Sequence, residues 1–423
     1  MGLVEGFSRS TLRQMTELYE GTTKNGLGAV LSNLKSFPKD ATLGTLVSGF
    51  LVVLVAVTGP IVIQLTAAKN GSFTDAQTSN WIFITWLTSG LFGLFLSLRF
   101  RMPMIGSPST ASMVLLVTSL QAHSINEAVA SYIIVAVTFI IIGATGAMRK
   151  IMKFIPHEII MAMLAGVLFQ FGVQIFTSFT AEPWLVFIMV LVFFVARRLN
   201  VRTPVVPVFI VGIVLTVALG KLQFNGADLF WVHPQFIQPD FTWASAINLA
   251  LPMVLATLAT QYAPGFTVLR SAKYQPPIKY SILTGGFISL FTAPFGNTGV
   301  NTSTITANIA VGEHADPDKT TRYTAGVLCG IFYITAAVFT IPIIDLFNML
   351  PPAMIATIAG LALMPALANS LHESVAGVQG REVAMATLLI TISGIQPLGL
   401  GSPFWGLVAG VVLSAIPLRT LKN

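Results

Sequence analysis

The chain has 423 residues, of which 54% are hydrophobic and only 9% are charged, and its mean hydropathy is +0.80. Because soluble domains carry about 25% charged residues, this composition excludes an ordinary soluble protein and indicates a polytopic membrane protein. The single cysteine, Cys329, excludes an intrachain disulfide. The net charge of +7 does not point to nucleic acid, because the positions of the basic residues have another explanation, given below.

Residues 1–41 form the first predicted unit, a cytoplasmic tail. The tail lacks the apolar run of an ordinary cleaved signal peptide. Within it, the stretch "LVEGFSRSTLRQMTELYEG" can form a short amphipathic helix that lies on the membrane surface. A partly ordered cytoplasmic tail is the alternative interpretation.

Fourteen apolar segments follow the tail. Their predicted ranges are 43–67, 79–98, 107–120, 126–148, 157–178, 183–198, 203–221, 245–270, 279–294, 301–312, 321–345, 351–370, 382–396 and 402–418. A membrane-spanning helix needs about 20 residues, and at about 1.5 Å per residue the third and tenth segments are too short to cross. Each of these two follows sequence rich in Gly, Pro or Asn, so we predict that both are half-helices.

The basic residues predict the orientation of the chain. With a cytoplasmic N-terminus and fourteen spans, 21 of the 23 Lys and Arg residues fall on the cytoplasmic side, and only Lys69 and Lys221 remain outside. This is the bias that the positive-inside rule describes. An odd number of spans would destroy the bias, because later loops would change side. Both termini are therefore predicted to be cytoplasmic.

Fourteen segments divide into two halves of seven, and an odd number per half makes tandem halves inverted relative to each other. Short matches support such a repeat, since placing Lys69 on Lys273 also aligns Pro60 with Pro264. The two short segments also occupy corresponding places in the halves. We therefore predict an all-α polytopic membrane protein with 14 transmembrane segments in a 7+7 inverted repeat.

Polar residues gather in the tenth segment, where eight of the twelve residues from Asn297 to Asn308 are Asn, Thr or Ser. Paired, interrupted short segments indicate the binding site of a transporter. A broken span is tolerated only inside protein or beside a cavity, because exposed backbone is costly in lipid. Since the N-terminal end of a helix attracts anions, two such ends near the midplane would bind a negatively charged group.

Segments 1 and 8 add polar groups beside predicted breaks. Thr58 precedes Gly59–Pro60, and Gln261 and Tyr262 precede Pro264–Gly265. A buried amide in lipid needs a partner or water. Interhelical hydrogen bonding is one interpretation of Gln261, but the coincidence of amide and break favours contact with a substrate. Tyr262 can stack on an aromatic ring or pack within the protein, and the sequence leaves both open.

Ionisable groups are scarce within the predicted spans. The five His residues fall at or near predicted loops, so we expect no metal site, and the absence of a Walker sequence excludes ATP as the energy source. We expect no cofactor and no enzymatic activity, because "IGSPS" (105–109) has a serine but no accompanying base. Glu158, at the start of segment 5, is a functional candidate, although capping of a helix N-terminus is the alternative.

Four stretches carry a family resemblance: "LSLRFRMPMIGSPST" (96–110), "IPHEIIMAMLAGVLFQFG" (155–172), "ATQYAPGFTVLRSAKY" (259–274) and "FGNTGVNTSTITANIAVGEHADPDKTTRYTAGVLCGIFY" (295–333). From residue 42 onward the chain resembles the bacterial benzoate/proton symporter (BenE) family. The resemblance implies the fold of nucleobase symporters and sulfate-type anion carriers. In that fold, segments 3 and 10 begin with short extended stretches, and substrate binds between their half-helices, against segments 1 and 8.

The same resemblance implies a division into a core domain and a gate domain, with a homodimer formed through the gate. The implied core consists of residues 42–148 (segments 1–4) and 223–345 (segments 8–11). The implied gate consists of residues 149–222 (segments 5–7) and 346–423 (segments 12–14 and a short C-terminal tail).

One residue departs from the pattern of the related nucleobase symporters, which place carboxylates on segments 8 and 10. Here the matching turn is Gly299-Val300-Asn301, with Val where an acid would stand. This disfavours recognition of a nucleobase in that style. A coupling proton would have to ride elsewhere, on Glu158 or on the substrate itself.

The function hypothesis is a secondary active importer of benzoate or a similar aromatic monocarboxylate, proton-coupled, in the bacterial inner membrane. Its partners are this anion, protons and the lipid bilayer. The residues expected to bind substrate are Asn297, Thr298, Asn301, Thr302, Ser107, Ser109, Thr110, Gln261, Tyr262 and Thr58. The alternatives are a nucleobase or inorganic-anion transporter, or an anion channel, on the same scaffold. A channel needs a continuous polar pore, whereas the polarity here lies at one depth.

Overall fold

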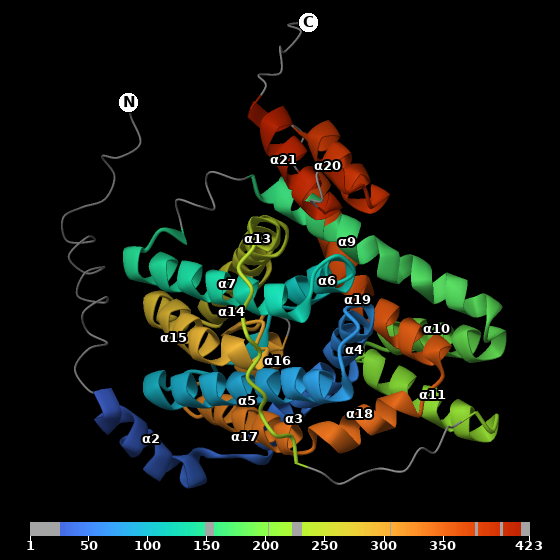
Figure 1. Cartoon of the computed structure of the whole chain (residues 1–423). Helices are drawn as coiled ribbons and strands as arrows, with labels where there is room; N and C mark the ends of the chain where they lie inside the picture. The colour runs from blue at the N-terminus through green and yellow to red at the C-terminus, as the bar shows by residue number, and fades with distance from the viewer. Residues whose placement is uncertain are drawn as a thin grey trace, which may run out of the picture.

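The computed structural model describes residues 26–148, 156–201, 203–221, 231–304, 306–376, 380–397 and 401–415. Over these residues the chain is mostly helical (Figure 1). The amphipathic helix predicted within residues 3–21 lies outside the described residues.

The elements before residue 148 are α2 (Gly26–Asp40), α3 (Leu43–Thr58), α4 (Pro60–Asn70), α5 (Asp75–Phe100), β1 (Gly106–Pro108), α6 (Thr110–Ser119) and α7 (Ile125–Thr145). Those between 156 and 221 are α9 (His157–Thr177), the 3-10 turn η1 (Ser178–Thr180), α10 (Pro183–Arg198) and α11 (Val205–Ala218). Next come α12 (Trp243–Ser245), the π-turn η2 (Ala246–Ala250), α13 (Leu251–Thr257), the π-turn η3 (Leu258–Tyr262), α14 (Ala263–Ser271) and α15 (Ile278–Thr292). The remaining elements are η4 (Ala293–Phe295), β2 (Val300–Thr302), α16 (Ala307–Val311), α17 (Tyr323–Val338), α18 (Thr340–Asn348), α19 (Pro352–Val375), α20 (Arg381–Ser393) and α21 (Ser402–Ala415).

Side-chain caps fix where several helices begin. Thr42, Thr74 and Ser124 each accept a hydrogen bond from the backbone N–H three residues later, and the side chain at that position accepts one in return. These capping boxes satisfy donors that a helix end leaves unpaired. The starts of α3, α5 and α7 are thus encoded locally, and they lie close to the predicted starts of segments 1, 2 and 4.

Helix length and composition agree with a membrane protein. Among the described residues, six helical runs are long and apolar enough to cross a membrane, and a seventh is counted if the bent pair α17–α18 is one span. Each of the fourteen predicted segments coincides with one helix or with a run of short elements. These lengths do not decide whether all fourteen segments cross, so the 7+7 arrangement stays a prediction.

The helices pack as two groups. The first bundle contains α3 to α7 and α13 to α17, and the second bundle contains α9, α10, α11, α19, α20 and α21. α17 lies along α5 in the first bundle, and α9 lies along α19 in the second (Figure 1). The bundles meet where α4 contacts α19, α3 contacts α11 and α6 contacts α9.

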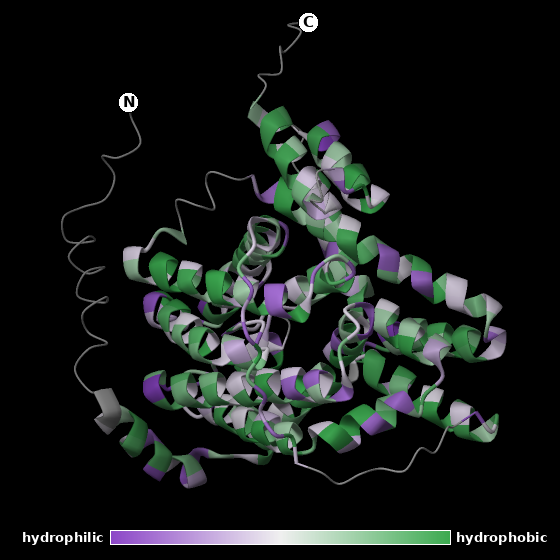
Figure 2. Cartoon of the chain, viewed as in Figure 1, coloured by the Kyte–Doolittle hydropathy of each residue, from purple (hydrophilic) through white to green (hydrophobic). Residues whose placement is uncertain are grey.

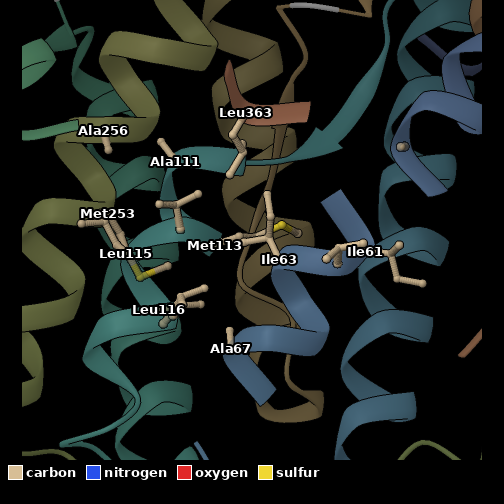
Figure 3. Close-up of a cluster of buried hydrophobic side chains, with 14 of the residues drawn as sticks. Ile61, Ile63, Ala67, Ala111, Met113, Leu115, Leu116, Met253, Ala256 and Leu363 are labelled. Atoms are coloured by element: carbon tan, nitrogen blue, oxygen red, sulfur yellow. The ribbon is translucent and has the colours of Figure 1, made fainter. Parts of the chain in front are cut away.

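The core of the first bundle is a continuous apolar cluster in which α4, α6 and α13 meet. Figure 3 shows Ile61 and Ile63 of α4 near Met113 of α6, with Met253 of α13 on the other side. All four side chains are fully buried. This packing holds α6 firmly although it is only ten residues long.

Two short strands join the halves of the chain. β1 and β2 pair antiparallel, with Ser107 opposite Asn301 and Pro108 opposite Val300. β1 lies so close to α5 that a Cβ on Gly106 would stand 2.2 Å from the Ser89 carbonyl oxygen. Only glycine fits such an approach. The extended stretches implied for segments 3 and 10 are therefore present, and they pair with each other.

Two local predictions are wrong, and one feature was not predicted. The helix of segment 10 begins at Ala307 rather than near 301, because Asn301 belongs to β2. Segment 11 has an unpredicted bend, since α17 and α18 meet at an angle of 67° next to Phe339. The predicted break at Pro264–Gly265 is absent, because the π-turn η3 leads directly into α14 and the run Trp243–Ser271 stays helical.

The outer surface of the helices is apolar. Hydrophobic residues dominate the ribbons, and hydrophilic ones gather mainly near helix ends (Figure 2). Among the large side chains left exposed are Phe187 and Leu191 of α10, Ile210 and Val214 of α11, and Phe291 of α15. A soluble monomer rarely exposes apolar area on this scale. Lipid is the solvent that suits this surface.

Candidate substrate site

A cavity of about 570 Å³ lies where the two bundles meet. Its volume falls in the range of about 300–1,000 Å³ that is usual for small-molecule sites. The first bundle contributes residues of α3, α4, α5, β1, α6, η3, α14 and α17, and the second bundle contributes residues of α9, α11 and α19.

Part of the cavity wall is apolar. It is formed by Val55, Ile63 and Trp86 of the first bundle and by Leu164 and Leu363 of the second. The indole and aliphatic side chains offer a surface on which a flat apolar ring can lie. This wall therefore suits the hydrophobic part of a ligand.

The rest of the lining includes polar, neutral side chains. Its aliphatic hydroxyl and amide side chains are those of Gln64, Ser107, Thr110, Thr260, Gln261, Thr267, Ser303, Thr304, Thr306, Asn369 and Ser370. The titratable side chains among the described lining residues are His157, Glu373 and Tyr333, so Lys and Arg do not contribute to this part of the surface. An anion would have to be held by neutral donors and helix dipoles.

The N-terminus of α6 supplies donors of this kind. Ser109 caps the helix by accepting a hydrogen bond from the Ser112 N–H. The N–H groups of Thr110 and Ala111, in the first turn, have no acceptor within the helix, and both residues line the cavity. The positive end of the α6 dipole therefore lies at the cavity.

Thr304 explains how the helix stays intact beside this cavity. Pro264 has no N–H and would leave a carbonyl of the preceding turn without a donor. The Thr304 hydroxyl donates to the carbonyls of Thr260 and Gln261, at 2.9 Å and 3.1 Å. A residue that follows β2 thus satisfies the backbone of the π-turn, which is how interrupted helices are tolerated in membranes.

Three of the ten predicted substrate residues line the cavity, namely Ser107, Thr110 and Gln261. Ser109 lies beside them but faces its own helix as the cap. Thr58 is the last residue of α3, and its side chain lies outside the described part of the structure.

The four predicted residues of segment 10 lie behind the cavity wall, and all are buried. Asn297 holds a turn, because its amide donates to the Thr292 hydroxyl at 2.7 Å and its oxygen accepts from the Gly299 N–H at 3.1 Å. The side-chain oxygens of Thr298, Asn301 and Thr302 are buried without a hydrogen-bond partner among the described residues. The structure therefore brings Asn301 opposite Ser107 but does not turn these groups into the cavity.

Tyr262 packs inside the first bundle. Its ring stacks on Phe266, with centroids 5.8 Å apart, and meets the edge of Phe139 at 5.3 Å. Its hydroxyl lies 2.7 Å from where a Cβ on Gly285 would stand. Of the two interpretations open at the sequence level, packing within the protein is the one that the structure shows.

Glu158 is half-buried in the first turn of α9 and does not line the cavity. Its neighbour His157 does, and the His157 Nε2 lies 2.7 Å from an oxygen of Glu373 on α19. The N-cap residue of α9 is Pro156, whose side chain makes no capping hydrogen bond, and Glu158 is the acidic residue of the first turn. A role for Glu158 in proton coupling stays a prediction.

Sequence reasoning missed two features of the site. Gln64 is fully buried at the cavity, and its side-chain oxygen has no partner among the described residues. A single amide inside an apolar segment was the available signal. His157 and Glu373 are 216 positions apart in the sequence. A local sequence pattern cannot predict such a contact.

Metal binding has no support from clustering. In the part of the chain that the structure describes, no group of three or more His, Cys, Asp or Glu side chains could hold a metal ion.

Comparison with known proteins identifies the family. The family model "BenE: Benzoate membrane transport protein" matches residues 39–416. The chain belongs to the BenE family of membrane transport proteins. It is 37% identical over 386 residues to the benzoate membrane transport protein of Acinetobacter baylyi, covering 91% of this chain and 98% of that protein. It is 36% identical over 379 residues to the inner membrane protein YdcO of Escherichia coli, covering 89% and 97%.

Solved structures support the fold of this BenE protein. The transmembrane domain of a cyanobacterial bicarbonate transporter, BicA, superimposes with a TM-score of 0.58, covering 87% of this chain and 97% of that one. The two sequences are 13% identical, so the likeness concerns the fold alone. A BenE protein is thus a transporter on an anion-carrier fold, as the sequence resemblance implied.

Proposed function

We propose that this BenE protein imports benzoate or a similar aromatic monocarboxylate together with protons. The observation that carries the proposal is the cavity lining, which combines apolar side chains with neutral hydrogen-bond donors and the N-terminus of α6. An aromatic carboxylate likewise combines an apolar ring with a charged group. The name of the relative from Acinetobacter baylyi agrees with this substrate class.

In the proposed binding mode, the carboxylate lies at the first turn of α6. The hydroxyls of Ser107 and Thr110 and the amides of Gln261 and Gln64 surround it, and all four residues line the cavity. The ring lies against Trp86 and the aliphatic wall. Hydrogen bonds to a charged group contribute about 1.5–3 kcal/mol each, so a few neutral donors and a dipole can hold an anion without a basic residue.

The proposed mechanism is alternating access of a core domain against a gate domain. The first bundle corresponds to the core implied for residues 42–148 and 223–345, and the second bundle to the gate implied for 149–222 and 346–423. The antiparallel pairing of β1 with β2, at corresponding places in the halves, supports the fourteen-segment inverted repeat. A homodimer through the gate, which the family resemblance implies, is part of the proposal.

The cavity reaches His157, Val205 and Glu373, which lie at helix ends predicted to be cytoplasmic. We interpret this arrangement as a cavity accessible from the cytoplasmic side, with both termini on that side. Import would then require the opposite end of the interface between the bundles to open in turn.

Two alternatives use the same scaffold. The likeness to a bicarbonate transporter is the reason to consider an inorganic-anion carrier. The apolar lining residues, however, offer no favourable contact to a small hydrated ion. A nucleobase carrier is disfavoured, since Val300 is buried and its N–H is already donated to the Ser289 hydroxyl at 2.9 Å.

Uptake into proteoliposomes tests the proposal. With an acidic exterior, labelled benzoate should accumulate above the external concentration, and a protonophore should abolish the excess. Uptake that never exceeds equilibrium would indicate a channel on this scaffold. Thermal-shift titrations with benzoate, uracil and sulfate separate the substrate classes, because stabilisation by sulfate or uracil alone would contradict the proposed substrate.

A further inference from the structure

A second cavity, of about 190 Å³, lies at the other end of the interface between the bundles. The first bundle contributes Thr118 and His123, near the end of α6, together with Asn248 of η2. The second bundle contributes residues of α9 and α20 and the start of α21. The orientation predicted from basic residues places this cavity on the outer side of the membrane.

A hydrogen bond between described residues links the bundles here. The backbone N–H of Gly401, which directly precedes α21, donates to the side-chain oxygen of Asn248 at 2.9 Å. A backbone N–H can only donate, so it fixes the orientation of the Asn248 amide. The oxygen must face Gly401, and the NH₂ group must face the other way.

The NH₂ group of Asn248 faces His123, and the two nitrogens, Nδ2 and Nε2, are 3.1 Å apart. Because Nδ2 can only donate, the Nε2 of His123 must be the acceptor and carries no proton. The His123 ring is therefore neutral, with its proton on Nδ1. His123 is 8% exposed.

A carboxylate lies on the other side of the ring. The Nδ1 of His123 is 3.4 Å from an oxygen of Glu127, which is close enough for an ion pair although the geometry is not that of a hydrogen bond. Glu127 is held by the Ser124 N–H and the Thr242 hydroxyl. The remaining polar side chains around this cavity, from α6, α9, α20 and α21, are neutral: Thr118, Ser119, Gln121, Gln170, Thr391, Gln396 and Ser402.

We propose that His123 is a proton-binding site, and that its protonation releases the outer contact between the bundles through Asn248. A proton added to Nε2 places two donors against each other. The Asn248 amide must then rotate, so that its oxygen accepts from Nε2–H. After this rotation its NH₂ group faces the Gly401 N–H, and the hydrogen bond between the bundles is lost.

The resulting charge is accommodated where it forms. The imidazolium lies beside the Glu127 carboxylate, so protonation creates an ion pair rather than an isolated buried charge. As a step in transport this inference rests on the proposed import cycle, in which acid outside would favour opening of the outer end. The hydrogen-bond exchange itself requires no substrate.

Cysteine labelling measures opening of this end directly. Ser402→Cys places a thiol in the cavity wall next to Gly401, where the serine is 8% exposed. Ala76→Cys, at an exposed position near the start of α5, is the matched control for the effect of pH on thiol reactivity. The native Cys329 is 1% exposed and provides the background. A membrane-impermeant maleimide is applied to intact cells at external pH 7.5 and 5.5.

Acidification should raise the labelling rate at position 402, relative to position 76, by roughly threefold to tenfold, the worth of one hydrogen bond. His123→Gln keeps an acceptor for Asn248 without a titratable group, so this ratio should not change with pH. Asn248→Asp can accept from Gly401 and from protonated His123 at once, so acid should not raise the ratio there either.

Two results would overturn the assignment: a pH-independent ratio with His123 and Asn248 both in place, or an equal rise after His123→Gln. Either His123→Gln or Asn248→Asp alone can test the assignment. If one of these variants fails to fold, the other still provides the test. Labelling uses no benzoate, so it can respond to pH even if benzoate uptake fails. In that case the substrate proposal falls and the proton site stands.

Discussion

The two strand–helix units, β1–α6 and β2–α16, pair with each other but use their polar residues differently. In the first unit, Ser107 and Thr110 face the substrate cavity, and the helix has ten residues. In the second unit, the helix has five residues, and Asn297 and Thr302 are fully buried. The second unit also lines the cavity, through Ser303, Thr304 and Thr306, but these residues follow its strand, whereas the first unit offers its N-terminus on a regular ten-residue helix.

This difference teaches that a polar residue in a membrane segment can serve the backbone as well as a ligand. The second unit has an irregular path, with Gly296 and Gly299 at positive φ and no long helix to satisfy its amides. Asn297 closes a turn and the Thr304 hydroxyl satisfies backbone carbonyls, whereas the side-chain oxygens of Thr298, Asn301 and Thr302 have no partner among the described residues. The first unit has a regular helix that satisfies itself, so its N-terminus is free for a ligand.

The largest expected effect is a loss of stability, and it compares the glycines that position the two units. Gly106→Ala should cost about 3 kcal/mol of stability, because the new Cβ would lie 2.2 Å from the Ser89 carbonyl oxygen, on a helix that cannot move aside. At Gly299 the nearest atom is the Ser289 hydroxyl oxygen at 3.5 Å, so Gly299→Ala meets only the strain of its φ of +110°. Thermal unfolding in detergent measures both, and equal losses would contradict the difference in packing.

The next effect is on benzoate affinity, and it compares a hydroxyl of the first unit with a hydroxyl of the second. Thr110→Val removes a hydroxyl at the cavity without changing shape, and benzoate affinity should fall roughly tenfold to a hundredfold, as for a lost hydrogen bond to a charged group. Thr302→Val removes a buried hydroxyl that has no partner among the described residues. Its affinity should be unchanged and its stability equal or higher.

Isothermal titration calorimetry with benzoate compares the two variants under one condition. If Thr302→Val loses affinity and Thr110→Val does not, the ligand lies on the side of the second unit. Asn301→Ala extends this test, because Asn301 lies opposite Ser107 in the strand pair but is only 2% exposed. An abolished affinity there would restore the sequence-based placement of the carboxylate.

Much of the fold follows from local sequence. Apolar run length placed the helices, and Thr42, Thr74 and Ser124 mark helix starts through chemistry that operates within one turn. The paired short segments were also predictable, and the strand stretches were implied by the family resemblance. The break predicted at Pro264 was wrong, because the effect of this proline on the helix depends on the hydroxyl of Thr304. Thr304 lies 40 positions later, and sequence alone cannot place it.

The candidate site was predictable in region but not in detail. Ser107, Thr110 and Gln261 were among the expected residues and do line the cavity. The direction in which Tyr262 points depends on Phe139 and Gly285, which belong to other helices. A residue's type shows that it can bind a ligand, whereas tertiary packing decides whether it faces one.

A smaller effect tests the contact between the second unit and the π-turn η3. Thr304→Val removes the donor to the carbonyls of Thr260 and Gln261. Leaving buried carbonyls without a donor costs about 1–3 kcal/mol, so the melting temperature should fall. Thr304→Ser keeps the hydroxyl and should retain most of the stability. If both variants lose the same stability, the methyl group rather than the hydrogen bonds holds this contact.

The smallest expected effect concerns Asp316, which ties the loop after α16 to the start of α3. Burial raises the pKa of Asp316, but hydrogen bonds from the Thr42 hydroxyl and the Asp318 N–H outweigh it and hold this pKa below the usual 3.8. A carboxyl group with a lowered pKa in the folded state stabilises the protein above its unfolded pKa, and this contribution disappears as the pH falls through the lowered value. Asp316→Asn should therefore lower the melting temperature slightly at neutral pH, and the difference should shrink as the pH falls below 3.8. Glu313→Gln, at an exposed position of the same loop, is the matched control and should show no such convergence. A difference between Asp316→Asn and the unsubstituted protein that stays constant with pH would mean that shape, and not charge, holds the second unit to α3.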